Sequence, residues 1–247
     1  MPAPIASLAQ SLHDVVVANR ILAHQGVVDA YGHVSVRHPF HPDRYLLSRS
    51  RSPELVEQAD ILEFMLDGTP VASDAPAPYV ERHIHGAVYE RRPDIHAVVH
   101  SHAIDVLPFT IGDIPLQPVI HVASDMGLEI PVWDIRDRFG DTNLLVSNIA
   151  QGRDLAACLA GHRVVLMRGH GFTVAGRTIV DVVKAAVYLP QNARVLKEAL
   201  LMGARVKALN AGEIAVRDRV DPWSPQMQRA WEYWALRAGV KPWLDGA

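Results

Sequence analysis

Apolar and polar residues follow two different spacings along this chain, and each spacing predicts its own kind of element. Apolar residues recur at every third or fourth position in the helix-like stretches, which are residues 5–28, 79–91, 141–160 and 178–202. The strand-like stretches are short and either alternating or continuously apolar, and they are residues 31–37, 45–47, 61–66, 95–99, 116–123, 164–167 and 172–175. The pattern therefore predicts a chain that mixes helices with short strands.

Turn and cap residues set the limits of several predicted elements. Asp67–Gly68 is a strong hairpin signal, which predicts a tight turn between two short strands. Thr178 and Asp181 have the spacing of an N-terminal helix cap, so a long helix is expected to begin there. A helix over residues 103–109 is expected to be interrupted at Pro108.

One domain is expected over residues 1–247, because the sequence contains no internal repeat, low-complexity segment or clear linker. The tail, residues 221–247, holds four of the five tryptophans. Within it, Trp231, Trp234 and Leu236 lie near helical spacing and predict an amphipathic helix. We expect this tail to pack on a neighbouring subunit.

Composition and charge exclude several classes of function. A hydrophobic content of 49% with 21% charged residues is typical of a soluble globular protein with a large core. The net charge of −3 offers no basic surface, so neither nucleic acid nor membrane is an expected partner. Residues 1–10 lack the features of a secretion signal, and no apolar run approaches the about 20 residues that span a bilayer. The single cysteine, Cys158, cannot form an internal disulfide, so a cytoplasmic location is expected.

His100 and His102 follow an apolar run, residues 95–99, in a His-x-His pattern. If this segment is a strand, both side chains point to the same face, with Cα atoms about 6.6 Å apart. Two imidazoles at that spacing can reach one metal ion. The pattern alone is also compatible with one buried core histidine and one histidine that faces solvent.

His170 and Glu81 are candidates to complete such a site. His170 stands between two glycines at a strand end, where the backbone can turn tightly and a ligand can approach closely. It would supply a third nitrogen, and three protein ligands plus an open position are typical of a catalytic metal site. Glu81, on the preceding helix, is a candidate fourth ligand or acid/base group. The ordinary alternatives are a turn histidine and a solvated helix glutamate.

Other candidates for substrate binding are basic side chains. Ser48–Arg49–Ser50–Arg51 contains no glycine to cradle a phosphate, but its two guanidinium groups suit carboxylates. The alternative for this segment is a solvated basic turn. His33 follows a glycine at a strand start and lies either in a pocket or on the surface. His85 either supports the site or lies buried in the core, and His121 is a further candidate substrate ligand.

With these motifs placed, the chain resembles the class II aldolase/adducin family over about residues 17–205. The resemblance is carried by residues 32–37 (Gly-His-Val-Ser-Val-Arg), 78–81 (Pro-Tyr-Val-Glu), 89–94 (Tyr-Glu-Arg-Arg-Pro-Asp), 97–103 (Ala-Val-Val-His-Ser-His-Ala) and 169–171 (Gly-His-Gly). It implies an α/β fold, with a three-layer α/β/α single domain around a mostly antiparallel sheet. It also implies a homo-oligomer, commonly a tetramer, with sites near the subunit interfaces.

The resemblance also assigns roles to the candidate residues. His100, His102 and His170 match the three metal-binding histidines of the family. Glu81 matches the glutamate that binds metal in the resting aldolases and acts as acid/base. Non-enzymatic adducin-like members lose these ligands, whereas this chain keeps them. The resemblance therefore implies an enzyme with one divalent metal ion per subunit, Zn or Mn before Fe or Co.

The departures from the family pattern concern the phosphate pocket. Sugar-phosphate aldolases of the family use an Asn in Gly-Asn-x-Ser, a Thr-Gly or Ser-Gly loop, and a Ser-Ser pair before the glutamate. Here these places hold His33, Ser50–Arg51 and Tyr79–Val80. Arginine and histidine suit a carboxylate and Tyr79 suits an aromatic ring, so His33 and Tyr79 join Glu81 as catalytic candidates. A family branch that decarboxylates hydroxylated aromatic or pyridine dicarboxylates looks similar, including the Ser-Arg-Ser-Arg stretch.

These departures favour a divalent-metal-dependent decarboxylase, a carbon–carbon lyase, of a hydroxylated aromatic or heteroaromatic carboxylate in aromatic catabolism. One alternative is a class II aldolase that cleaves a non-phosphorylated hydroxy-oxo acid. An alternative of another class is a non-catalytic adducin-like interaction module. Both enzyme reactions break a carbon–carbon bond beside an oxygen-bearing group, where a metal can stabilise the developing charge. The expected partner is a small anionic substrate.

Overall fold

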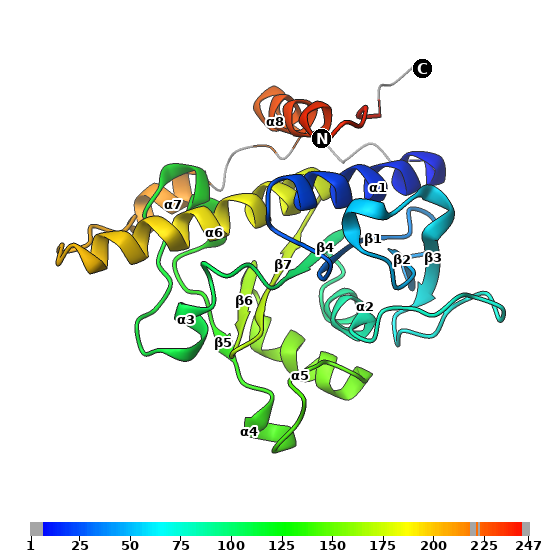
Figure 1. Ribbon diagram of the computed structural model, residues 1–247, viewed down its shortest axis with the longest axis horizontal. Coiled ribbons are helices and arrows are strands. Elements are labelled where there is room, and N and C mark those ends of the chain that lie inside the picture. Colours follow the sequence, from blue (N-terminus) through cyan, green and yellow to red (C-terminus); the bar gives the residue numbers. More distant parts are fainter. Residues whose placement is uncertain (1–6, 218–220, 222, 244–247) are drawn as a thin grey trace.

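A seven-stranded sheet forms the centre of the fold in the computed structural model, which describes residues 7–217, 221 and 223–243 (Figure 1). In sheet order the strands are β3 (Ile61–Met65), β2 (Arg44–Ser48), β1 (His33–Arg37), β4 (Ala97–Ser101), β7 (Gly171–Gly176), β6 (Val164–Met167) and β5 (Val132–Trp133). All neighbouring strands are antiparallel except β5 and β6. The predicted α/β fold with a mostly antiparallel sheet is confirmed.

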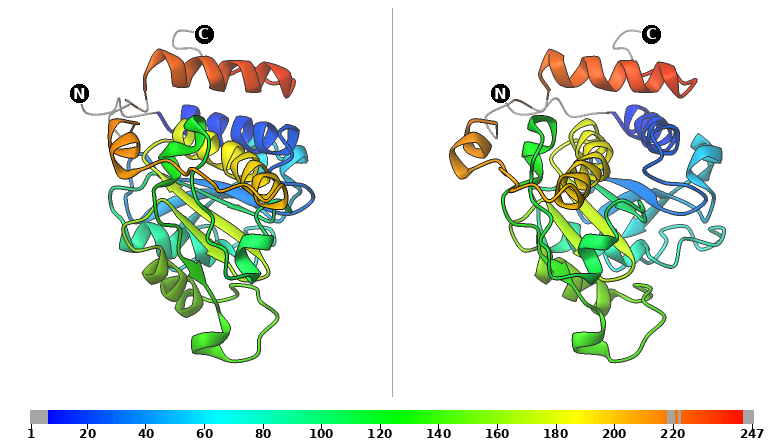
Figure 2. Two further views of the ribbon diagram at one scale, coloured as in Figure 1. Left: turned by 90° about the vertical axis from the view of Figure 1, so that its left-hand side faces the viewer. Right: turned by 60° about the vertical axis from the view of Figure 1, so that its left-hand side comes forward.

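Helices cover both faces of this sheet. On one face lie α1 (Leu8–His24) and α6 (Ile179–Leu201), and on the other lie α2 (Arg82–Arg91) and α5 (Ile149–Leu159). A further helix, α8 (Pro225–Arg237), lies outside α1 and α6 as an additional layer (Figure 2). The short helices are α3 (Pro108–Ile111), α4 (Arg136–Phe139) and α7 (Ala211–Arg217). Among the described residues, no helix has the length and apolar character needed to cross a membrane.

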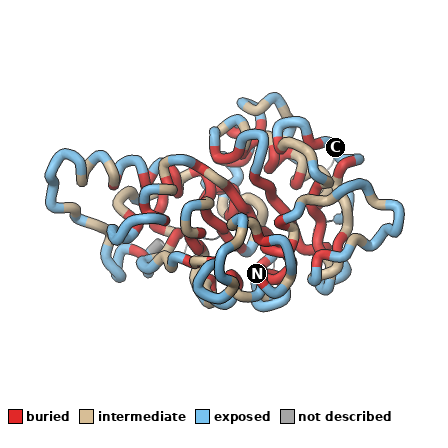
Figure 3. Tube along the Cα trace, turned by 60° about the horizontal axis from the view of Figure 1, so that its bottom comes forward, coloured by how far each residue is buried: buried red, intermediate tan, exposed pale blue. Residues whose placement is uncertain are grey.

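Strand residues alternate between two buried apolar clusters, one on each face of the sheet. Val34 and Val99 belong to the cluster under α1 and α6, whereas Val98 belongs to the cluster under α2 and α5. Because side chains alternate with period 2, His100 shares the α2 face with Val98, and so does Ser35, which pairs with Val98 in the register. Buried residues follow the strands and the inner faces of the helices (Figure 3). The α2 face of the sheet therefore carries the polar residues of interest.

Most predicted elements are present, with shifted ends. The Thr178 hydroxyl accepts the Asp181 backbone N–H at 3.0 Å and caps the long helix α6, as the spacing predicts. The turn at Asp67–Gly68 also forms, with Gly68 at a positive φ of 88°. The strand expected after this turn is reduced to a single bridge between Phe64 and Pro70, because proline has no N–H to extend a ladder.

The strand predicted over residues 116–123 is wrong. The segment is a loop that leads into a 3₁₀ helix, His121–Met126. The Asn192 side chain accepts the backbone N–H groups of Val119 and Ile120 and donates to the Gln117 carbonyl. These bonds from α6 satisfy backbone groups that would otherwise need a neighbouring strand.

Two predicted helices also differ from the structure. The helix expected over residues 141–160 begins only at Ile149, because Asn148 accepts the Gln151 N–H as an N-cap and Leu144 has a positive φ of 66°. Pro108 does not interrupt a helix but begins α3, where its missing N–H costs no hydrogen bond.

The tail packs on its own chain within the described residues. Trp231 and Trp234 are buried in the cluster shared with α1 and α6, and the Tyr188 and Trp234 rings lie 5.8 Å apart. Leu236 is exposed and stays available for a contact outside the chain. Contact of the tail with a neighbouring subunit stays a prediction, and the part of it at residues 222 and 244–247 lies outside the described residues.

Candidate metal centre

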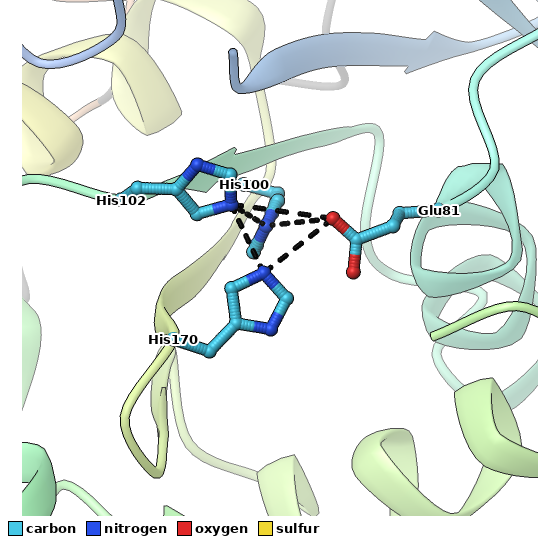
Figure 4. A group of neighbouring side chains, drawn as sticks. All are labelled: Glu81, His100, His102 and His170. Carbon is cyan, nitrogen blue, oxygen red and sulfur yellow. Dashed lines mark hydrogen bonds and ion pairs between the residues drawn. The ribbon is translucent and has the colours of Figure 1, made fainter. Parts of the chain in front are cut away.

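Glu81, His100, His102 and His170 converge at one point beside the end of β4 (Figure 4). The Nε2 atom of His102 lies 2.9 Å from that of His100 and 3.0 Å from that of His170. The Glu81 Oε2 atom lies 3.4 Å from His100 Nε2, 4.0 Å from His102 Nε2 and 3.5 Å from His170 Nε2. The structure therefore brings together all four residues that the sequence predicts as metal ligands.

The pairing of β4 with β7 places His170 beside the His-x-His pair. Gly171 begins β7 directly across from the end of β4, and a Cβ atom at Gly171 would lie 2.0 Å from the Ser101 carbonyl oxygen. Gly169, on the other side of His170, has a positive φ of 63°. The two glycines thus permit a turn that no pair of larger residues could adopt.

Backbone carbonyls fix which nitrogen of each imidazole carries the proton. His100 Nδ1 lies 3.0 Å from the Phe172 carbonyl oxygen, and His170 Nδ1 lies 3.0 Å from the Leu144 carbonyl oxygen. A carbonyl can only accept a hydrogen bond, so each Nδ1 is the protonated atom. The Nε2 lone pairs of both rings therefore point to the centre of the group, as they do in metal-ligating histidines.

These donors fit a divalent cation. Lone pairs that face each other across about 3 Å repel unless a proton or a metal ion lies between them. A tetrahedral ion with bonds of about 2.0–2.1 Å holds its ligand atoms about 3.3 Å apart. Four of the spacings in this group lie between 2.9 and 3.5 Å, and the 4.0 Å spacing of Glu81 from His102 would have to shorten. Three imidazole nitrogens and one carboxylate suit Zn²⁺, and they are also found with other first-row metals.

Glu81 occupies a different position from the one expected. It is the N-cap residue of α2 rather than a residue within the helix. Its Oε1 atom accepts the backbone N–H of Val146 at 3.0 Å, which leaves Oε2 to face the histidines. Burial raises the pKa of Glu81, but His100 and His170 lower it by more, so the carboxyl group stays ionised.

The group is open to solvent at His102. The His102 side chain is 31% exposed, whereas those of His100, His170 and Glu81 are almost fully covered. Burial and the neighbouring His100 lower the pKa of His102 to about 4, so it is a neutral ligand at neutral pH. A substrate therefore has access to the centre from the side of His102.

His33 and His85 lie beside this centre and contact each other. The His33 ring centroid lies 5.1 Å from that of His100 and 4.6 Å from that of Tyr79. His33 Nδ1 lies 2.6 Å from His85 Nε2. Burial and the neighbouring His85 lower the pKa of His33, and burial and His100 lower the pKa of His85 to about 3. Both rings are therefore neutral.

The two arginines of the Ser48–Arg51 segment are already paired with an acidic residue. Arg49 Nε donates to Asp60 Oδ1 at 2.6 Å, and Arg51 donates to Asp60 Oδ2 at 2.7 Å. Asp60 is buried, and the exposed Glu57 carboxylate also lies 3.9 Å from Arg51, so two cations face two anions. Nothing in the sequence pattern pointed to Asp60, which lies outside every motif.

Tyr79 links this basic segment to the centre. Its hydroxyl donates to the Arg51 carbonyl and accepts from the Ser48 hydroxyl, while its ring lies against His33. Ser50 is exposed, with its backbone N–H bonded to the Ala77 carbonyl. Tyr79 thus connects the segment to the centre, because its ring contacts the His33 ring and the His33 ring contacts that of His100.

His121 is not brought to these residues. It is exposed at the start of the 3₁₀ helix that replaces the predicted strand, and it is not a member of the metal-ligand group found among the described residues. Its role in substrate binding stays a prediction.

Known proteins with similar sequences include decarboxylases and aldolases. Decarboxylase tropJ of Talaromyces stipitatus is 37% identical over 197 residues, which are 74% of each chain. The 3,4-dihydroxyphthalate decarboxylase of Arthrobacter keyseri is 28% identical over 217 residues, 81% of this chain and 83% of that protein. An L-fuculose phosphate aldolase of Escherichia coli is 28% identical over 192 residues, 75% of this chain and 81% of that protein.

A solved structure and a family profile agree with these relatives. An aldolase II superfamily protein from Pseudomonas syringae superposes with a TM-score of 0.76 at 18% identity, over 97% of this chain and 96% of that one, and so shares the fold. Residues 13–196 match the Class II Aldolase and Adducin N-terminal domain. The chain therefore belongs to the class II aldolase and adducin family and is an enzyme of that family.

Proposed function

We propose that this protein is a divalent-metal-dependent decarboxylase of a hydroxylated aromatic or heteroaromatic carboxylate. The observation that carries the proposal is the combination of a Glu81/three-histidine centre with a neighbouring Tyr79 ring and a basic segment. The names of two relatives, decarboxylase tropJ and 3,4-dihydroxyphthalate decarboxylase, point in the same direction.

Glu81, His100, His102 and His170 are the proposed ligands of one divalent cation, with Zn²⁺ or Mn²⁺ favoured. When bound, the cation supplies a Lewis acid that stabilises negative charge on a substrate oxygen. The protein's own contribution is to hold three of the four ligands in place before the substrate arrives: the Phe172 carbonyl holds His100, the Leu144 carbonyl holds His170 and the Val146 N–H holds Glu81.

Arg49, Arg51 and Tyr79 are the proposed substrate-binding side chains. Each guanidinium group uses one N–H for Asp60 and keeps others, and these remaining donors suit one carboxylate of the substrate. Tyr79 is held by Ser48 and Arg51, so its ring is a fixed surface on which an aromatic substrate can stack. This arrangement favours a planar anion over a sugar phosphate.

The proposed reaction breaks the bond between a ring carbon and a carboxylate carbon. Carbon dioxide leaves, the bonding electron pair stays on the ring carbon next to the hydroxyl-bearing carbon, and one proton adds to that ring carbon. Glu81 is one candidate for this proton transfer, because an ionised carboxylate can take the proton of the substrate hydroxyl and return it to carbon. His33 is the other candidate, because it lies beside both Tyr79 and His100.

The second candidate function is the cleavage of a non-phosphorylated hydroxy-oxo acid by an aldolase reaction. The same four candidate metal ligands would serve this reaction. In addition, the L-fuculose phosphate aldolase has the same sequence identity to this chain, 28%, as the dihydroxyphthalate decarboxylase of Arthrobacter keyseri. The third candidate, a non-catalytic adducin-like module, is disfavoured because such a module has no need for four converging ligand atoms.

We also propose that the protein is a homo-oligomer, a tetramer by analogy with its family, in the cytoplasm. Three large apolar side chains, Tyr31, Ile104 and Ile111, are exposed next to the centre. The Tyr31 ring lies 6.4 Å from that of His102, and Ile104 is two residues after His102 in the chain. Ile111 would lie 4.0 Å from a Cβ atom at Gly169, the neighbour of His170. Exposed apolar groups that gather in one place favour a protein partner.

The test is an assay of carbon dioxide release. Zinc- and manganese-loaded protein is incubated with a panel of hydroxylated phthalates and hydroxypyridine dicarboxylates, and both carbon dioxide and the decarboxylated ring product are quantified. The proposal predicts equal amounts of the two products for at least one acid. Pyruvate or an aldehyde formed from a hydroxy-oxo acid, with no carbon dioxide from any aromatic acid, would support the aldolase function instead.

A further inference from the structure

A row of four buried polar groups runs from the metal centre into the protein, between β1 and α2. His33 Nδ1 lies 2.6 Å from His85 Nε2, and His85 Nδ1 lies 2.6 Å from the Ser35 hydroxyl oxygen. The Ser35 hydroxyl in turn lies 2.8 Å from the Tyr89 hydroxyl. All four side chains are at least 97% buried, so water does not compete for these bonds.

The elements explain why these four groups meet. His33 and Ser35 are two residues apart on β1 and share one face of the strand. His85 and Tyr89 are four residues apart on α2 and share one face of the helix. The helix packs on that face of the sheet, so the two pairs interleave into one row.

The direction of the hydrogen bonds follows from counting protons. Two neutral imidazoles and two hydroxyls carry one proton each, which makes four protons for three bonds. If the bonds ran from His33 to Tyr89, the Tyr89 hydroxyl would need another acceptor. Among the described residues, the hydrogen bond found for this hydroxyl is the one with Ser35, and no carbonyl or carboxylate oxygen accepts its proton. A buried hydroxyl proton without an acceptor costs about 1–3 kcal/mol.

The opposite direction satisfies every group inside the row and leaves one proton for the end beside the centre, where His33 Nε2 is not among the fully buried unpaired atoms of the described residues. Tyr89 donates to Ser35, Ser35 donates to His85 Nδ1, and His85 Nε2–H donates to His33 Nδ1. The fourth proton then resides on His33 Nε2, at the end of the row nearest the metal centre. His33 in this form has no free lone pair, which explains why it lies beside His100 without belonging to the ligand group.

We propose that Ser35, His85 and Tyr89 are positioning residues that hold His33 as its Nε2–H tautomer, so that His33 donates a hydrogen bond to a substrate oxygen beside the metal centre. The use of that donor by a substrate rests on the proposed function. The tautomer itself does not, because it follows from the contacts within the protein.

The test reads the tautomer directly. Protein with ¹⁵N-labelled histidine is loaded with Zn²⁺, and the His33 nitrogen signals are assigned by their loss in His33→Asn. The proposal predicts a protonated Nε2 and an unprotonated Nδ1 on His33. In Ser35→Ala the donor to His85 is lost, so the Nδ1-protonated form of His33 should appear as a second population. In Tyr89→Phe the hydroxyl proton that sets the direction of the row is lost, and the Ser35 hydroxyl can then accept from His85 Nδ1, so the same second population should appear.

Ser124→Ala is the matched control, because Ser124 is also buried and, among the described residues, its hydroxyl bonds the His121 carbonyl alone. It should leave the His33 signals unchanged. A native His33 protonated on Nδ1, or a Ser35→Ala spectrum identical to the native one, would overturn the proposal.

If the tautomer shifts as expected and carbon dioxide release falls in proportion to the lost Nε2–H population, the donor acts in the reaction. If the tautomer shifts but no carboxylic acid is a substrate, the positioning role holds and only the proposed function fails.

Discussion

The Nε2 atoms of His102 and His170 lie 3.0 Å apart, although 68 residues separate them in the chain. The contact depends on the antiparallel pairing of β4 with β7 and on glycine at position 171, where any side chain would collide with the Ser101 carbonyl. The histidines of the candidate metal centre are thus brought together by one strand pair, and Glu81 joins them from the N-terminus of α2, which packs on β4.

Removal of one ligand should abolish metal binding and turnover together. In His170→Ala the remaining three ligand atoms no longer surround a cation, so we expect less than one tenth of the native metal content after dialysis. Metal content is measured by plasma mass spectrometry, and His24→Ala, an exposed histidine on α1, is the control. Full metal content in His170→Ala would contradict the assignment of that ligand.

Gly171 should tolerate no side chain. A Cβ atom there would lie 2.0 Å from a backbone oxygen, so Gly171→Ala forces β4 and β7 apart. We expect a loss of about 2–4 kcal/mol in the free energy of unfolding, measured in urea, together with weaker metal binding. Gly161→Ala is the control, because its Cβ would meet no atom within 4 Å. Equal stability of the two variants would show that the strand pair can adapt.

Asp60 should matter for both stability and substrate affinity. Burial by itself raises the pKa of Asp60. Hydrogen bonds from the Glu57 N–H, Arg49 and Arg51 outweigh that effect, so the pKa of Asp60 is lowered. A depressed carboxyl pKa stabilises the fold above the unfolded value of about 3.9, and this contribution is lost as the pH falls through the folded value. Asp60→Asn should lose about 1–3 kcal/mol at pH 7 and show a smaller change than the native protein between pH 5 and 3.

The same variant separates binding from chemistry. Asp60→Asn frees Arg49 and Arg51 from their shared anchor, so the placement of a substrate carboxylate is lost while the metal ligands stay intact. We expect KM to rise about tenfold or more with kcat changed less, a split that steady-state kinetics measures directly. A fall in kcat at constant KM would place Asp60 in the chemistry instead.

His85 should make the protein less stable as the pH falls. Burial and His100 lower its pKa to about 3, whereas the unfolded chain binds a proton near 6.5. The unfolded state therefore binds more protons between these values, and stability decreases by about 1.4 kcal/mol for each pH unit below 6.5. Urea unfolding of the native protein and of His85→Gln at pH 7, 6 and 5 checks this, and the variant should have the shallower slope by about that amount.

The sequence was most informative where a pattern is local. The period of a strand is enough to put His100 and His102 on one face, and a Gly-His-Gly turn is enough to single out His170. Groups that depend on which helix covers which strand were not predictable in the same way. The His85–Ser35 contact joins α2 to β1 across 50 residues, and Asp60 meets Arg49 and Arg51 only because the chain folds back after the basic segment.

The difference between local patterns and long-range packing also explains why the strand predicted over residues 116–123 is wrong. Residues 116–123 have a strand-like pattern, but the Asn192 side chain, 72 residues from Ile120, satisfies their backbone groups in a loop. His121 was predicted on that strand and lies instead at the start of a 3₁₀ helix, and its role in substrate binding stays a prediction. Local spacing does not contain the position of Asn192, which the packing of α6 determines.

The most direct test of the central claim is a titration of metal-free protein with Zn²⁺ or Mn²⁺ while carbon dioxide release from a carboxyl-labelled hydroxyphthalate is followed. The four converging ligands of each chain predict that activity rises linearly and stops rising at one metal ion per chain. His102→Ala, which lacks the most exposed ligand, should show no such rise. Carbon dioxide release by the metal-free protein at the full rate, or the absence of any release at one equivalent across the whole panel of acids, would contradict the account.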